Sequence, residues 1–141
     1  MNPIIIVISI VVVGIVAVGL LVLISRKRAL SAADRERIRE MWNNVELLMA
    51  DENESSWVKA VFEADKILDY GLSVMGIAGN GLGERLKNGK SLFNNVQAAW
   101  DAHKLRNQLA HEIDMKLARH EAERAVRLFK DSLRQLGIMN S

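Results

Sequence analysis

The pattern of apolar and polar positions divides the chain into one long apolar segment followed by several amphipathic segments. Residues 4–24 form an apolar run that is broken only by Ser9, Gly14 and Gly19. As a helix, a run of this length reaches about 30 Å, which is the thickness of the hydrocarbon core of a bilayer. The pattern therefore predicts a transmembrane anchor over residues 1–25, in contact with the lipid bilayer through residues 4–24.

The residues that flank the apolar run favour a membrane anchor over a cleaved signal peptide. No basic region precedes the run and no small-x-small cleavage site follows it. Arg26, Lys27 and Arg28 come next, and the positive-inside rule then places the C-terminal side in the cytoplasm. We expect a single-pass protein of the inner (cytoplasmic) membrane with its N-terminus outside, a basic juxtamembrane linker at 26–30 and a cytosolic helical domain at 31–141.

The rest of the chain has apolar residues at the spacing of α-helices. The first helix is expected to begin at a capping box, Ser31 to Asp34, and the last to stop at Gly137. The first predicted helix covers residues 31–50. The second follows the acidic residues 51–54 and runs to about Met75, the third runs from about Ser91 through the segment 100–112, and the fourth ends at Leu136. No alternating β pattern is present, so the sequence predicts an all-α fold with a four-helix up-down bundle.

The glycine-rich stretch at residues 76–83 is expected to connect the second and third helices. It contains Asn80-Gly81, a strong turn signal. A glycine loop that cradles phosphate would need a preceding strand and a following Lys-Ser or Lys-Thr, and this stretch has neither. A short helical turn is expected at residues 82–87, with Asn88-Gly89 interrupting it.

Composition and charge exclude several kinds of site in the domain expected at residues 31–141. The 141 residues suffice for one anchor and one small domain, and the net charge of +2 is too mild to indicate nucleic-acid binding by itself. The absence of cysteine excludes disulfides, zinc-thiolate sites and thiol nucleophiles. No metal or cofactor site is expected. Asp65 and Asp69 have the spacing of paired carboxylates, but no histidine lies at a matching spacing, so we expect them to be solvated or paired with arginine.

The polar residues of the segment 100–112 are the strongest candidates for chemistry. Arg106 supplies a fixed fork of donors that matches a phosphate, and His111 can move a proton near neutral pH. Together they form a minimal set for cleaving a ribonucleotide backbone by attack of the 2'-hydroxyl, with the histidine as base or acid and the arginine stabilising the phosphorane. Asn107 and His103 lie close by in the sequence.

Helical geometry sets a condition on this pair. Five steps along a helix rotate the side chain by about 500°, so Arg106 and His111 point about 140° apart. They converge only if the helix ends or distorts near Ala110, or if each meets a second copy of the chain. His103, Asn107 and His111 instead follow one helix face, where a dimer seam would make a composite site.

A purely structural interpretation of the same residues is also open. Arg106 would then pair with an acid such as Asp65, Asp69 or Glu112, and the histidines would cap the third helix or lie half exposed.

The motif R-N-x-x-A-H resembles the HEPN superfamily, a group of all-α domains marked by Arg-x4-6-His with Asn, Asp or His after the arginine. Arg106, Asn107 and His111 match that pattern. The resemblance extends over about residues 42–136. Within the superfamily, the chain looks like a group of uncharacterised, membrane-anchored bacterial proteins. The further matching segments are 63–70 (E-A-D-K-I-L-D-Y), 82–86 (L-G-E-R-L) and 121–126 (E-A-E-R-A-V).

This resemblance implies a homodimer with facing motifs. In catalytic members it implies a metal-independent endoribonuclease that leaves 2',3'-cyclic phosphate ends, while other members bind nucleotides or proteins without cleaving. By resemblance, His111 is the proton-transfer group, Arg106 the phosphate contact and Asn107 a polar support, whereas His103 and Glu112 would have local supporting roles. The function implied is RNA cleavage or nucleotide binding in stress or phage defence. The alternative is a non-enzymatic module that recruits a partner protein at the membrane.

Overall fold

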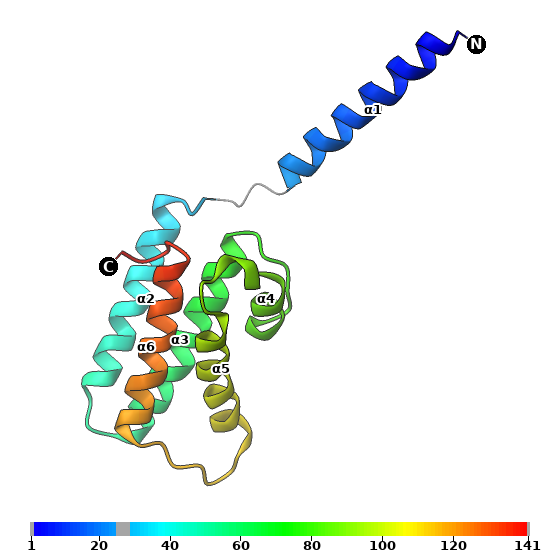
Figure 1. Cartoon of the computed structure of the whole chain (residues 1–141). Coiled ribbons are helices and arrows are strands. Elements are labelled where there is room, and N and C mark those ends of the chain that lie inside the picture. Colours follow the sequence, from blue (N-terminus) through cyan, green and yellow to red (C-terminus); the bar gives the residue numbers. More distant parts are fainter. Residues whose placement is uncertain (1, 25–28, 141) are drawn as a thin grey trace.

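The computed structural model describes residues 2–24 and 29–140, and every regular element in these ranges is a helix (Figure 1). The expected all-α class is confirmed. The basic residues Arg26, Lys27 and Arg28, on which the predicted orientation rests, lie outside the described residues.

The first helix, α1 (Pro3–Ile24), is long and apolar enough to cross a membrane. Every side chain from Asn2 to Leu21 is exposed in the isolated chain. A helix that is apolar on all sides must bury its surface in lipid or in protein. The predicted apolar helix is therefore present, and it does not bury these side chains against the rest of the chain.

Local capping signals fix the start of α2 (Ala32–Ala50). The backbone N–H of Asp34 donates to the Ser31 hydroxyl at 3.0 Å, and the Ser31 N–H donates to the Asp34 carboxylate at 3.3 Å, which is the predicted capping box. The Tyr70 hydroxyl donates to the same carboxylate at 3.1 Å. The hydrogen bonds from Ser31, and then that from Tyr70, hold the pKa of Asp34 below its usual value.

Helix α3 (Glu54–Val74) ends close to the predicted position. The Asn53 side chain caps it by accepting the N–H of Ser56 at 2.9 Å. Gly76 follows with a positive φ of 84°, a conformation that a residue with a β-carbon rarely adopts. The helix therefore stops at the glycine that the sequence indicated.

Tertiary contacts shorten the next helical segment. Short helices occur at α4 (Leu82–Asn88) and in a 3₁₀ turn (Lys90–Leu92), but α5 (Val96–His111) begins at Val96, so the predicted start near Ser91 is wrong. The backbone N–H groups of Asn94 and Asn95 donate to the Gln135 side chain at 3.0 and 3.1 Å. These long-range bonds replace the helical bonds that the sequence pattern suggested.

The last helix, α6 (Arg119–Gln135), follows a loop in which Asp114 has a positive φ of 123°. Leu117 holds this loop against α3, because its side chain is buried and its backbone N–H donates to the Glu54 carboxylate at 2.7 Å. Gly137 follows the helix with a φ of 68°, as the predicted stop requires.

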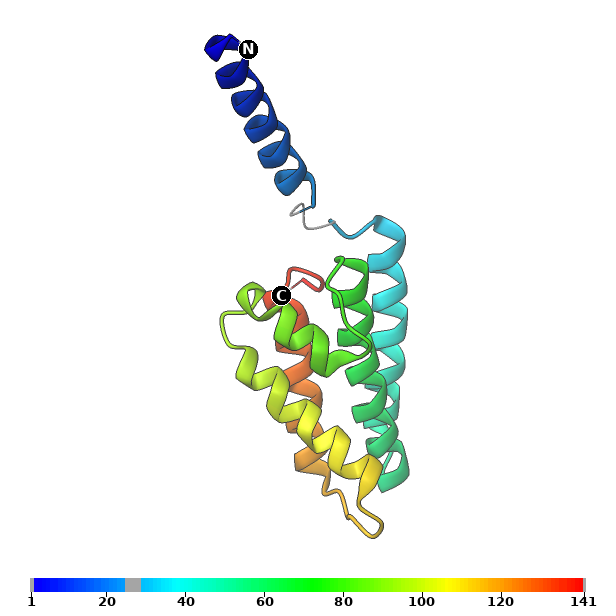
Figure 2. The ribbon, with the colours of Figure 1, turned by 90° about the vertical axis from the view of Figure 1, so that its right-hand side faces the viewer.

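Helices α3 and α6 form the centre of the part that follows α1, with α2 packed on α3 and α5 packed on α6 (Figures 1 and 2). Helices α2 and α5 run in one direction and α3 and α6 in the other, and α4 packs on α3 and α5. The largest fully buried apolar side chains come from α2, α3, α4 and α6: Ile38, Val45, Val61, Ile67, Leu68, Leu72, Leu86, Phe129 and Leu133.

The exposed apolar surface of α1 predicts that the full chain stays in the membrane pellet after alkaline extraction, whereas residues 29–141 alone are soluble. A Val12→Lys substitution places a charge in the middle of the span and costs about 2.5–3.5 kcal/mol of insertion free energy. It should move part of the protein to the soluble fraction, and Val12→Leu should not. Mass spectrometry provides the counter-test, since a mature chain without residues 2–24 would identify α1 as a cleaved signal sequence.

Candidate functional site

The polar residues of α5 face α3 near the end of the molecule that α4 covers. His103, Arg106 and Asn107 are half-buried there, while His111 is the last residue of α5 and is exposed. The structure therefore brings three of the five sequence-predicted site residues together and leaves His111 and Glu112 apart from them.

Asp65 of α3 and three residues of α5 form a closed ring of polar contacts. The Asp65 carboxylate lies 2.6 Å from His103 Nδ1, and His103 Nε2 lies 3.2 Å from the Asn107 side-chain nitrogen. The Asn107 side-chain oxygen accepts from Arg106 Nη1 at 3.1 Å. The ring closes at Arg106 Nε, which is 3.6 Å from the other Asp65 oxygen.

The order of donors and acceptors in this ring fits one tautomer of His103. A carboxylate accepts hydrogen bonds, so the proton of the imidazole lies on Nδ1, facing Asp65. Nε2 then accepts from the Asn107 amide, whose oxygen in turn accepts from Arg106. Turning the Asn107 amide over would break both of its bonds, so the ring holds all four side chains in one arrangement.

Arg106 contacts Phe62, Asp65 and Asn107, and one nitrogen of its guanidinium is left for a ligand. Its guanidinium lies 4.8 Å from the centre of the Phe62 ring, a cation–π contact. Its Nε is buried and has no hydrogen-bond partner, since 3.6 Å from Asp65 exceeds hydrogen-bond length. About a quarter of the side chain is exposed (28%), and within the described residues no group accepts from Nη2. That nitrogen is therefore available to an anionic ligand.

The pairing of Asp65 with His103 is the contact that the sequence did not indicate. Asp65 was expected to be solvated or paired with arginine. It does pair with Arg106 at 3.6 Å, but it is 5% exposed and its shortest contact is with His103. Its position four residues after Val61 and three before Leu68 puts it on the apolar face of α3, and a charged residue at such a position was the available signal. Asp69 does pair with an arginine, Arg85, at 2.6 Å.

The structural interpretation of Arg106 is thus realised within one chain, by Asp65 and not by Asp69 or Glu112. Helix α5 ends at His111, as one route to convergence required, but no described contact joins Arg106 to His111. Neither His111 nor Glu112 makes a described side-chain contact, and Glu112 caps the helix only through its backbone N–H. The fold does not explain why a histidine stands at position 111.

An open cleft of about 420 Å³ lies beside the ring, between α3, the start of α4 and α5. Its lining is mostly polar or glycine: Asp65, Lys66, Asp69, Asn80, Gly81, Leu82, Gly83, Glu84, His103 and Arg106. The candidate phosphate contact, Arg106, is therefore also a wall of a cleft that the sequence did not indicate.

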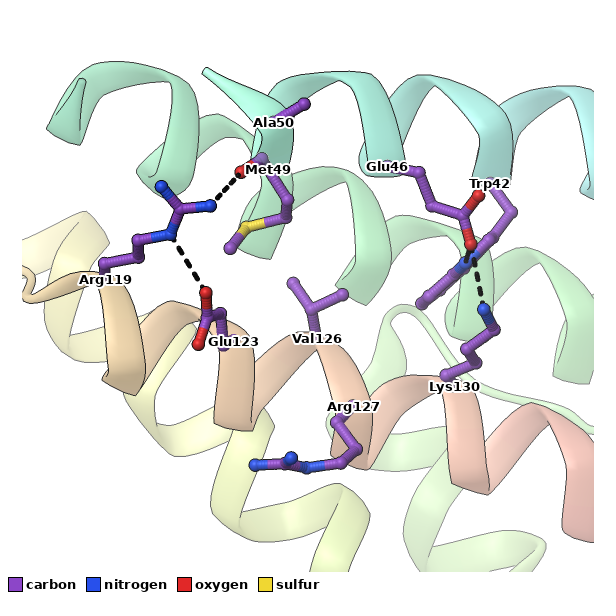
Figure 3. Close-up of a pocket in the computed structure, with 9 residues that line it drawn as sticks. All are labelled: Trp42, Glu46, Met49, Ala50, Arg119, Glu123, Val126, Arg127 and Lys130. Atoms are coloured by element: carbon purple, nitrogen blue, oxygen red, sulfur yellow. Dashed lines mark hydrogen bonds and ion pairs between the residues drawn. The ribbon is translucent and has the colours of Figure 1, made fainter. Parts of the chain in front are cut away.

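A second concavity, of about 390 Å³, is the groove between α2 and α6 shown in Figure 3. Met49 and Val126 lie between the two helices, and four of the charged groups at the rims are paired (Figure 3). Lys130 bonds Glu46 at 2.8 Å, which chiefly holds the pKa of Glu46 below its usual value. Arg119 pairs in the same way with Glu123 at 2.9 Å. The Glu46–Lys130 bond joins α6 to α2, and the lining of the groove includes no histidine.

Known proteins give no further information on the site. The chain matches no protein-family description, no curated protein and no solved structure. Within residues 2–24 and 29–140, no three His, Asp or Glu side chains are grouped so that they could hold a metal ion. The HEPN assignment stays a prediction from the motif.

Removing the Asp65 carboxylate should destabilise the fold, whereas removing the His111 imidazole should not. Asp65→Ala leaves His103 and Arg106 partly buried without their acceptor, a loss of about 1–3 kcal/mol in the free energy of unfolding. The exposed His111→Ala and Asp101→Ala variants should stay within about 0.5 kcal/mol of wild type. Urea unfolding followed by tryptophan fluorescence measures this, because all three tryptophans lie in helices α2, α3 and α5. Equal stability of the Asp65 and Asp101 variants would contradict a structural ring.

The Glu46–Lys130 bond predicts a pH-dependent contribution to stability. Because the folded-state pKa of Glu46 is lowered, its charge stabilises the fold above the ordinary pKa of 4.5, and this is lost as the pH falls through the lowered value. Glu46→Gln should therefore unfold more easily than wild type at about pH 7, and the difference should vanish at about pH 3. Thermal unfolding at low salt checks this, with the exposed Glu52→Gln as a control. A difference independent of pH would refute the assignment.

Proposed function

We propose that this protein is a membrane-anchored, HEPN-like module that faces the cytoplasm and acts on RNA or nucleotides through Arg106 and His111. In this proposal α1 is a single-pass anchor and α2, α3, α5 and α6 form the four-helix up-down bundle of that superfamily. The site is composite: two copies of the chain bring their motifs together. The role suggested by the resemblance is stress or phage defence.

The observation that carries the proposal is the contrast between Arg106 and His111. Arg106 is fixed by Asp65 and Asn107, yet its Nη2 is left for an external anion. His111 is exposed at the end of α5 and has no described role in the fold. An ordered arginine and an unoccupied histidine five positions apart in R-N-x-x-A-H are what phosphodiester cleavage needs, once a second copy supplies the missing proximity.

The reaction follows from these groups. His111 takes the proton of the 2'-hydroxyl while the 2'-oxygen attacks phosphorus, and the bond from phosphorus to the 5'-oxygen breaks. The 5'-oxygen leaves with a proton from a protonated histidine, which the second copy of His111 can supply. Arg106 stabilises the charge on the phosphorane oxygens, and the products are a 2',3'-cyclic phosphate and a 5'-hydroxyl. No metal takes part in these steps.

A non-enzymatic interaction module is the second candidate, and one observation favours it. The closed ring of Asp65, His103, Asn107 and Arg106 gives each of these residues a structural role that requires no substrate. In this case the protein recruits a partner protein to the membrane, and His111 is an exposed surface residue.

Cleavage of mixed RNA by the full chain in detergent micelles separates the two candidates. We expect fragments with 2',3'-cyclic phosphate ends in the presence of a chelator. The rate should fall by about 10²–10⁴-fold in His111→Ala, which loses proton transfer. It should fall by about 10²–10³-fold in Arg106→Ala, which loses stabilisation of the phosphorane charge.

His120→Ala is the matched control, because His120 is an exposed histidine outside the motif, at the start of α6. It should cleave like wild type. Intact RNA with wild type and all variants, together with a stable complex with another protein, would replace the enzyme by the interaction module.

A further inference from the structure

The cleft between α3, α4 and α5 is not used by the reaction proposed above. That reaction needs Arg106 and His111, whereas the cleft extends from Arg106 in the direction of α4. Its size of about 420 Å³ is in the range of small-molecule sites. A concave, polar surface beside an arginine with an unused hydrogen-bond donor is typical of a ligand-binding site.

Carboxylates outnumber fixed cations in the lining of the cleft. The lining includes Asp65, Asp69 and Glu84 against Lys66 and Arg106. Asp65 lies opposite Arg106 at 3.6 Å, and Asp69 bonds Arg85, outside the lining, at 2.6 Å. The interior of the cleft therefore has no excess of positive charge that would select a free phosphate, and it favours a neutral polar ligand.

Both kinds of hydrogen-bonding group line the cleft. Asp69 uses one oxygen for Arg85, and Glu84 uses one for the backbone N–H of Asn80, so each keeps a second oxygen as an acceptor. Donors come from the Asn80 side-chain amide and from Arg106 Nη2. A heteroaromatic ring with both N–H donors and ring acceptors matches this set.

Glycines shape the wall of the cleft at the start of α4. A β-carbon at Gly81 would meet nothing within 4 Å, and the φ of 178° is extended backbone that any residue adopts. A β-carbon at Gly83 would lie 3.5 Å from His103 Nε2 and 3.6 Å from the Trp100 ring. Because Gly81 has no side chain, the space next to it in the cleft is left open.

We propose that this cleft is a nucleobase subsite, which holds the base of the nucleotide whose phosphate Arg106 contacts. The inference rests on the proposed function for the identity of the ligand. Asp69 and Glu84 accept hydrogen bonds from an exocyclic amine, so adenine, guanine and cytosine bind better than uracil, which has no such group. Arg106 then lies at the junction of two subsites: its Nη2 reaches the phosphate, and its place in the cleft wall aligns the base.

Binding of uncharged nucleosides to the full chain in detergent micelles tests this subsite without the phosphate. Equilibrium dialysis with adenosine, guanosine, cytidine, uridine and inorganic phosphate should give binding of the three amine-bearing nucleosides, weaker binding of uridine and none of phosphate alone. Gly81 lines the cleft and a β-carbon there meets nothing within 4 Å, so Gly81→Leu adds bulk at the cleft wall and should weaken binding at least about tenfold. Ala33→Leu adds a similar bulk to an exposed position of α2 and should leave binding unchanged.

A second measurement makes the result independent of how well Gly81→Leu folds. In wild type, added guanosine should shift the backbone amide NMR signals of residues 80–84 and not those of residues 42–50. No nucleoside binding, equal binding by Gly81→Leu that melts like wild type, uridine as the tightest ligand, or phosphate binding alone would each overturn the subsite.

Failure of the subsite and failure of the proposed function are distinguishable. RNA cleavage that depends on Arg106 and His111 but is unaffected by Gly81→Leu, with no nucleoside binding, removes the subsite and keeps the function. Nucleoside binding that Gly81→Leu abolishes, with no RNA cleaved, keeps the subsite and removes the ribonuclease.

Discussion

The buried carboxylate of Asp65 is the constraint on which the arrangement of α3 and α5 depends. A charge that is 5% exposed is costly unless charged and hydrogen-bonded partners compensate it. Its partners, His103 and Arg106, both come from α5, so only one register of α5 against α3 satisfies it. Apolar packing alone would tolerate small sliding of the helices, whereas a hydrogen bond of 2.6 Å does not. The polar ring therefore specifies the geometry that the apolar core stabilises.

The same ring limits what the α5 motif can do within one chain. His103 uses both ring nitrogens, and Asn107 uses both ends of its amide, so neither is free for a substrate without breaking a bond that supports Asp65. Arg106 keeps Nη2, and His111 keeps its whole side chain. Some residues of the motif are therefore used by the fold. The Nη2 group of Arg106 and the imidazole of His111 are the groups of the motif that remain for a ligand.

Local signals were readable from the sequence and long-range ones were not. The capping box at Ser31, the glycine stops and the long apolar helix depend on neighbouring residues, and all of them were predicted. The start of α5 was misjudged because Gln135, some forty residues away, captures the backbone N–H groups there. The pairing of Asp65 with Arg106 was foreseen, but its contact with His103 was not, for the same reason, since His103 is 38 residues further along the chain. Periodicity identifies helices, but it does not say which charged side chain will meet which.

Arg106 lies away from His111 on α5 but next to the cleft at α4. About 140° of helix rotation separates it from His111, so a single ligand atom cannot contact both within one undistorted α5. Arg106 does, however, line the cleft at α4 in its own chain. In the proposed function, a nucleotide bound there holds its phosphate at Arg106, and His111 of a second copy has to reach that phosphate. Under that proposal binding needs one chain and cleavage needs two, so the activity would depend on how densely the protein gathers in a membrane.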